Sequence, residues 1–338
     1  MDSSDLNELQ GLDKNGLRPR KTGPIPVITQ ILLLLLTVTF MVIGAPAPLS
    51  LYGLAMLGCA SALLAFMCAA LPLGVWNAVL ALGVSGALGF LANQMPEMLP
   101  TMLGSCCGGL TLWRLLRRRV RRNTAIVWLC AIFLLSGALW AGMYLRDALH
   151  DTIDWAQLGA GWTTELESRL SEAGLDSSMA ETYVRYALSL TPAFCMVVGM
   201  LYGWICTAVF GWLCRLFFRD WLLHAPAWRV EMSGVSAGVF LGALLIGLFS
   251  SGAQLSPVPM SAMNLLVVLL PGFFVEGFRL LRTMLRQRRS GGLSALAVVG
   301  AALLLFLNSS AFLMMIAIGG AVSVLADAIR SRPRAGRE

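Results

Sequence analysis

The chain has 338 residues, of which 57% are hydrophobic and only 13% are charged, and its mean hydropathy is +0.75. A soluble domain of this size usually carries about 25% charged residues, so the composition excludes a soluble globular protein. The formal net charge is +7. The basic residues stand in short links between apolar runs, which argues against a nucleic-acid-binding module.

Apolar runs of roughly twenty residues recur along the chain, and this is the length that crosses the hydrocarbon core of a bilayer as a helix. Backbone polar groups in lipid must be satisfied within the segment, so each run is expected to be helical. The sequence therefore predicts an all-α, polytopic transmembrane helix bundle. The predicted spans are 25–44, 48–70, 73–92, 98–116, 124–145, 190–214, 232–251, 260–281, 292–307 and 311–328.

These spans divide the chain into five segments. They are a polar tail (1–23), the first five spans (24–145), an acidic segment (146–189), the last five spans (190–328) and a basic tail (329–338). The first span is expected to stay uncleaved, because its apolar run is longer than that of a signal peptide and Pro48 directly follows the small-residue site.

The placement of Lys and Arg supports ten spans. With ten spans, 22 of the 25 basic residues fall on one side of the membrane. The positive-inside rule makes that side cytoplasmic, with both termini inside. A single long helix after residue 292 would put the last two basic clusters on opposite sides, so Asn308 to Ser310 is predicted to be a tight turn.

The segment 146–189 is predicted to lie outside the cytoplasm, because it carries eight acidic residues and three arginines. Thr164 with Glu167, and Ser178 with Glu181, have the spacing of helix capping boxes. At this length the segment has little core of its own, so it is expected to lean on the bundle. It is either a lid over a substrate entrance or a solvated connector.

A second polar stretch, "FFRDWLLHAPAWRVE" (217–231), is predicted on the cytoplasmic side. Its two tryptophans suit the headgroup layer and its arginines suit lipid phosphates, which favours an interfacial anchor. The alternative is a loop that docks a cytoplasmic partner.

Small residues four positions apart predict close helix packing within the bundle or against another membrane subunit. The residues with this spacing are Gly104, Gly108, Gly199, Gly203, Gly234, Gly238 and Gly242.

Polar residues at membrane depth are candidates for a binding site. Asn77, Asn264 and Glu276 are such residues here. Arg279 follows Glu276 by three positions, so a local ion pair is the competing interpretation for that acid. Pro271 and Gly272 just upstream are expected to kink the same helix, as in ligand-binding helices of transporters.

No set of residues predicts catalysis. The eight cysteines fall within predicted spans without CxxC spacing, and the two histidines are predicted on opposite sides of the membrane. No GxSxG, HExxH or phosphate-binding loop motif is present. No catalytic residue, metal or cofactor is therefore predicted, and the protein is not expected to be an enzyme.

The motifs "FFRDW" with a following Pro and Trp, "FFVEGFRLL" around Gly277, and "IGGAVSVLADAIRSR" with Gly320, Asp327 and Arg330 carry a family resemblance. The chain resembles the YybS-like DUF2232 family of bacterial membrane proteins over about residues 25–335. That resemblance implies a multi-pass protein of a bacterial plasma membrane. It also implies a distant similarity to S components of energy-coupling-factor transporters and to the shape-determining protein MreD.

Two roles follow from this resemblance and from the residues. A solute-transport-type protein like an S component is favoured by the helix-breaking pairs and the polar midplane residues, and its small-molecule substrate is unknown. The alternative is a scaffold or assembly factor that binds other membrane proteins. The first span lacks the AxxxA spacing through which S components dock to their energising subunit. Beyond such subunits, the bilayer is the expected partner, and nucleic acid is not.

Overall fold

The computed structural model describes most of the apolar part of the chain, and the regular secondary structure in that part is helical. The described residues are 27–71, 73–91, 95–118, 120, 122–148, 163–165, 168, 169, 172, 177–217, 232–250, 256–287 and 309–330. The predicted ninth span, 292–307, and all but the first residue of the stretch 217–231 lie outside the described residues.

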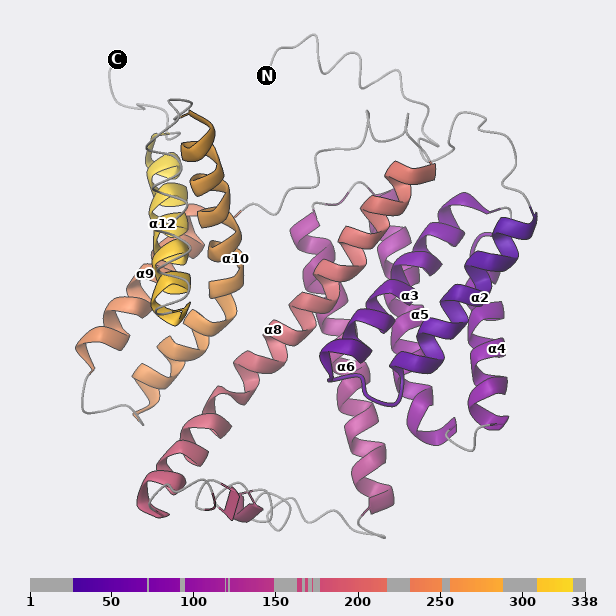
Figure 1. Cartoon of the computed structure of the whole chain (residues 1–338), viewed down its shortest axis with the longest axis horizontal. Coiled ribbons are helices and arrows are strands. Elements are labelled where there is room, and N and C mark those ends of the chain that lie inside the picture. Colours follow the sequence, from indigo (N-terminus) through magenta and orange to yellow (C-terminus); the bar gives the residue numbers. More distant parts are fainter. Residues whose placement is uncertain are drawn as a thin grey trace. The chain divides into compact units, whose positions relative to one another are not determined.

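The described helices follow the predicted spans (Figure 1). They are α2 (Val27–Gly44), α3 (Leu51–Ala70), α4 (Trp76–Leu91), α5 (Met95–Arg117), α6 (Arg122–Ala148), α8 (Ser177–Phe217), α9 (Gly234–Phe249), α10 (Pro257–Gln287) and α12 (Ser309–Arg330). The all-α prediction is confirmed for this part of the chain. The total of ten spans and the cytoplasmic location of the termini remain predictions.

Six of the described helices contain a stretch long and apolar enough to cross a membrane. These stretches are Val27–Gly44, Leu51–Ala70, Arg122–Met143, Thr182–Cys214, Pro257–Thr283 and Leu313–Arg330. The apolar helices α4 and α9 have 16 residues each. The chain is thus a membrane protein with several apolar spans.

Unit 1, the first of two compact units, contains α2 to α6 and the part of α8 that begins at Val198. Its central helix is α3, where 72% of the residues in the most apolar window are buried, against 17% to 39% in the other five long helices. This helix is rich in Ala, Gly, Ser and Cys, and such small side chains let neighbouring helices approach closely. Its start is fixed by Ser50, whose Oγ accepts a hydrogen bond from the Gly53 N–H at 2.9 Å.

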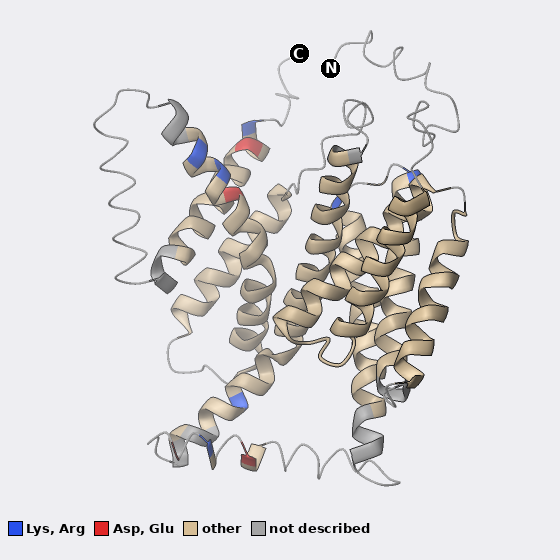
Figure 2. Cartoon of the chain, turned by 45° about the vertical axis from the view of Figure 1, so that its right-hand side comes forward, with Lys and Arg blue, Asp and Glu red and all other residues tan. Residues whose placement is uncertain are grey.

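Unit 2 contains the first part of α8 together with α9, α10 and α12. Phe240 of α9 and Phe273 of α10 meet in its core, with ring centroids 4.9 Å apart. In Figure 1, α10 and α12 run in the same direction and α9 runs against them. The basic C-terminal ends of α10 and α12 therefore lie at the same end of this unit (Figure 2).

The helix α8 is longer than the predicted span 190–214 that it contains. It runs without interruption from Ser177 to Phe217, and Pro192 lies inside it. Ser178 is consequently inside the helix rather than at its cap. Apolar surroundings favour continuity, because an interrupted helix would leave backbone groups without partners, whereas an internal proline is tolerated in membrane helices.

Candidate functional site

Three buried hydroxyl groups meet at the centre of unit 1. The Ser61 Oγ on α3 lies 2.6 Å from the Tyr202 hydroxyl oxygen on α8 and 2.9 Å from the Ser105 Oγ on α5. All three side chains are at most 3% exposed. The Tyr202 ring also stacks on Phe133 of α6, with centroids 4.7 Å apart. Four helices therefore converge on one polar cluster.

The hydrogen bonds of this hydroxyl cluster can all be satisfied internally. Ser61 can donate to the Ser105 carbonyl oxygen at 2.9 Å, and Ser105 can donate to the Leu57 carbonyl oxygen at 3.1 Å. Tyr202 then donates to Ser61. Each hydroxyl donates once, so the cluster ties helices together and leaves no donor directed at a ligand.

This cluster was not predicted from the sequence, because serine and tyrosine hydroxyl groups are common in membrane helices and only amides and carboxylates stood out as polar groups. A signal was present: Ser105 lies between Gly104 and Gly108, and Tyr202 directly precedes Gly203. A Cβ atom added to Gly108 would lie 2.6 Å from the Tyr202 hydroxyl oxygen. The glycine therefore makes the space that the hydroxyl group occupies.

Asn77, the first predicted binding residue, has a structural role. Its side chain is 4% exposed, and its Nδ2 donates to the carbonyl oxygens of Met67 at 3.3 Å and Gly74 at 3.0 Å. These two carbonyls belong to the end of α3 and to the turn that leads into α4. Asn77 thus closes the connection between two helices, and both of its amide hydrogens are engaged.

Asn264, the second predicted binding residue, retains one free acceptor. Its Nδ2 donates to the carbonyl oxygens of Ser189 at 2.9 Å and Met260 at 3.0 Å, which joins α10 to α8 within unit 2. Its Oδ1 is buried and has no hydrogen-bond partner among the described residues. A buried amide oxygen without a partner is costly, so this atom could accept a hydrogen bond from a water molecule or a solute.

Glu276, the third predicted binding residue, forms the expected ion pair with Arg279. The Glu276 Oε1 and the Arg279 Nη1 are 2.8 Å apart, and the Glu276 side chain is 15% exposed. The acid therefore has its charge partner one turn away on the same helix.

Five of the seven predicted packing glycines lie against another helix of the same unit. A Cβ on Gly199 would lie 2.6 Å from the Cys130 Sγ, and one on Gly203 would lie 2.9 Å from the Ile126 carbonyl oxygen. Gly104 faces Ser136, Gly108 faces Tyr202, and Gly234 faces Ala328. At Gly238 and Gly242, no described atom lies within 4 Å of such a Cβ. A contact for these two remains a prediction.

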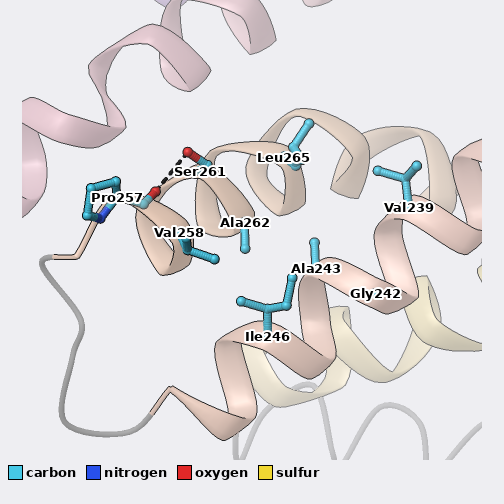
Figure 3. Close-up of a pocket in the computed structure, with 9 residues that line it drawn as sticks. All are labelled: Val239, Gly242, Ala243, Ile246, Pro257, Val258, Ser261, Ala262 and Leu265. Carbon is cyan, nitrogen blue, oxygen red and sulfur yellow. Dashed lines mark hydrogen bonds between the residues drawn. The ribbon is translucent and has the colours of Figure 1, made fainter.

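An apolar groove of about 450 Å³ lies between α9 and α10 and is lined in part by Gly242 (Figure 3). Its lining residues are Val239, Gly242, Ala243, Ile246, Pro257, Val258, Ser261, Ala262 and Leu265. Ser261 supplies the one polar side chain of this lining, and its hydroxyl group donates to the Pro257 carbonyl oxygen at 2.8 Å. Nothing polar is left for a hydrophilic ligand, so the groove suits apolar side chains or lipid tails.

The residues Gly277 and Gly320, which carry part of the family resemblance, meet where α10 crosses α12. A Cβ on Gly277 would collide with the Ile316 carbonyl oxygen, and one on Gly320 would collide with the Phe273 carbonyl oxygen. Each glycine therefore allows one helix backbone to touch the other. The motif positions are explained by packing.

In the described part of the chain, no three His, Cys, Asp or Glu side chains are grouped so that they could hold a metal ion. The eight cysteines, all described, are free thiols.

The family model for predicted membrane proteins DUF2232 matches residues 35–322. The chain belongs to this family. The match covers α3 to α10 and most of α2 and α12, so both units belong to the shared architecture. No curated protein and no solved structure matches the chain.

Proposed function

We propose that this DUF2232 protein is a scaffold that binds a transmembrane helix of another membrane protein, in the plasma membrane of a bacterium. The observation that carries the proposal is the contrast among its glycines. Five packing glycines are covered by neighbouring helices, whereas Gly238 and Gly242 have no described atom within 4 Å of a Cβ position, and Gly242 lines an apolar groove. Helices in lipid associate through such small residues, because they let two backbones approach closely.

The occupant is expected to be a helix with apolar side chains. The groove presents Val239 and Ile246 from α9 and Val258 from α10, and its serine hydroxyl is already engaged. Such a lining offers dispersion contacts but no hydrogen bond, so affinity comes from close packing.

Crosslinking in intact membranes tests the proposal. A photoreactive residue at Val258, which is 65% exposed, should yield an adduct with one defined membrane protein. Gly242→Leu should abolish this adduct, because the new side chain occupies the approach surface. Gly211→Leu on α8 is the matched control, since no described atom lies within 4 Å of its Cβ position either. The control should retain the adduct.

Other outcomes would overturn the proposal. Adducts with lipid alone would show that acyl chains fill the groove. An adduct of twice the chain mass would show self-association. An adduct that persists in Gly242→Leu would place the contact elsewhere.

Solute transport is the second candidate, and Asn264 is the observation that favours it. The buried Oδ1 without a partner lies on α10, upstream of Pro271 in the same helix. Many transporters place substrate sites near a proline in a membrane helix, and α10 carries Pro271 within an unbroken helix. Under this role, Asn264→Leu should abolish solute uptake by vesicles while leaving the Val258 adduct unchanged.

A further inference from the structure

One end of unit 1 gathers four arginines. Arg114 and Arg117 lie in the last turn of α5, Arg118 follows directly, and Arg122 begins α6. Among the side chains that the structure describes in this unit, none is Asp or Glu. For Arg114, Arg117 and Arg118, the described side chains of the unit therefore offer no acid as counter-charge (Figure 2).

Neighbouring residues hold part of this cluster in place. The Arg122 Nε donates a hydrogen bond to the Thr207 Oγ1 of α8 at 3.1 Å. One turn away, Gly203 lets α8 touch the backbone of α6 at Ile126. The Arg117 guanidinium lies 5.8 Å from the centre of the half-buried Trp113 ring. Arg114 and Arg118 are exposed beside them. Arg122 and Arg117 are thus held by contacts at a corner formed by α5, α6 and α8.

The location of this corner indicates which class of ligand it binds. It lies at the end of α5, beside α6 and α8, which contain stretches long and apolar enough to cross a membrane. A tryptophan beside arginines is typical of the headgroup layer. Guanidinium groups bind phosphate through paired N–H groups. We propose that the corner of α5, α6 and α8 binds the phosphate of an anionic phospholipid headgroup.

Unit 2 offers the contrasting case. Its basic end also carries the acids Glu276 and Asp327, and Glu276 is already paired with Arg279. Acids at that end repel a lipid phosphate and compete for the arginines. The site is therefore specific to unit 1.

Native mass spectrometry of the full chain, released from detergent with graded phosphatidylglycerol or phosphatidylcholine, tests the inference. The wild type should retain phosphatidylglycerol in preference to phosphatidylcholine. Arg114→Gln combined with Arg118→Gln should lower the phosphatidylglycerol affinity by about fivefold per arginine. Arg282→Gln, at the basic end of unit 2, is the matched control and should change little.

Millimolar inorganic phosphate separates the two sources of this ligand. Retention of phosphatidylglycerol in its presence supports a lipid site. Displacement by phosphate would assign the corner to a free anion and overturn the proposal. Equal retention of both lipids, or an unchanged affinity in the double variant with an unchanged melting temperature, would also overturn it.

Discussion

Unit 1 joins its helices through a buried hydroxyl cluster, whereas unit 2 brings α10 and α12 together backbone to backbone at two glycines. In unit 1, Ser61, Ser105 and Tyr202 share directional bonds across three helices. In unit 2, Gly277 and Gly320 leave no room for even one methyl group. The two kinds of helix contact respond differently to substitution. Loss of one hydrogen bond costs little free energy in a membrane. A collision with a backbone atom cannot be relieved by rotating a side chain.

The basic ends of the two units also differ in the acidic residues that lie near their arginines. The arginines of unit 1 stand without described acids, whereas those of unit 2 are mixed with Glu276 and Asp327. At the first end, no described side chain of the unit supplies a negative charge. The second end supplies part of the counter-charge within one helix.

The largest effect is expected at the glycine crossing of unit 2. Gly277→Leu should destabilise the protein by about 3 kcal/mol or more, because its Cβ meets the Ile316 backbone. The readout is thermal unfolding in detergent. Gly319→Leu is the control, since no described atom lies within 4 Å of its Cβ position. Equal melting temperatures for the two variants would contradict the crossing.

The next effect is expected at the turn of unit 1 between α3 and α4. Asn77→Ala leaves the Met67 and Gly74 carbonyl oxygens without this donor and should cost about 1 to 2 kcal/mol. Chemical unfolding in mild detergent measures this loss. Asn77→Asp removes the amide donors at nearly unchanged volume and should destabilise at least as much. A stable Asp variant would show that the hydrogen bonds are dispensable.

A smaller effect is expected when the Tyr202 hydroxyl group alone is removed. Tyr202→Phe removes one buried hydrogen bond, which averages about 0.6 kcal/mol in membrane helices. Tyr202→Ala should cost about 3 to 5 kcal/mol, because it also removes the ring that stacks on Phe133 and leaves a cavity. The ratio of the two losses, measured by the same unfolding assay, checks whether the ring or the hydroxyl dominates. Equal losses would contradict the packing argument.

The smallest effect is expected at the ion pair of unit 2. Glu276→Gln keeps a similar shape and removes the charge, so its cost should stay near the value of about 0.3 to 0.5 kcal/mol that is typical of ion pairs one helical turn apart. If transport depends on this acid, the variant should instead lose vesicle uptake at full stability. Uptake and melting temperature measured on the same preparation separate these outcomes.

The sequence alone determined which segments are helical. The composition indicates that most of the chain lies in lipid rather than in water. In lipid, the backbone N–H and C=O groups of an apolar run must form hydrogen bonds within the run, which requires a helix. The bounds of α2, α3 and α12 therefore lie within a few residues of their predicted spans. The local pair of Glu276 and Arg279 was also predictable, because a spacing of three residues places both side chains on one face of a helix.

Tertiary structure alone decided what each polar or small residue touches. Asn77 and Asn264 look alike in the sequence, yet the first has both amide hydrogens engaged and a structural role, and the second retains a buried acceptor. Gly203 and Gly242 have the same helical spacing, but one lies against Ile126 and the other borders an open groove. Helical periodicity fixes only the face on which a residue lies. The neighbour that meets this face belongs to a distant part of the chain, and lipid, unlike water, does not favour one apolar face over another.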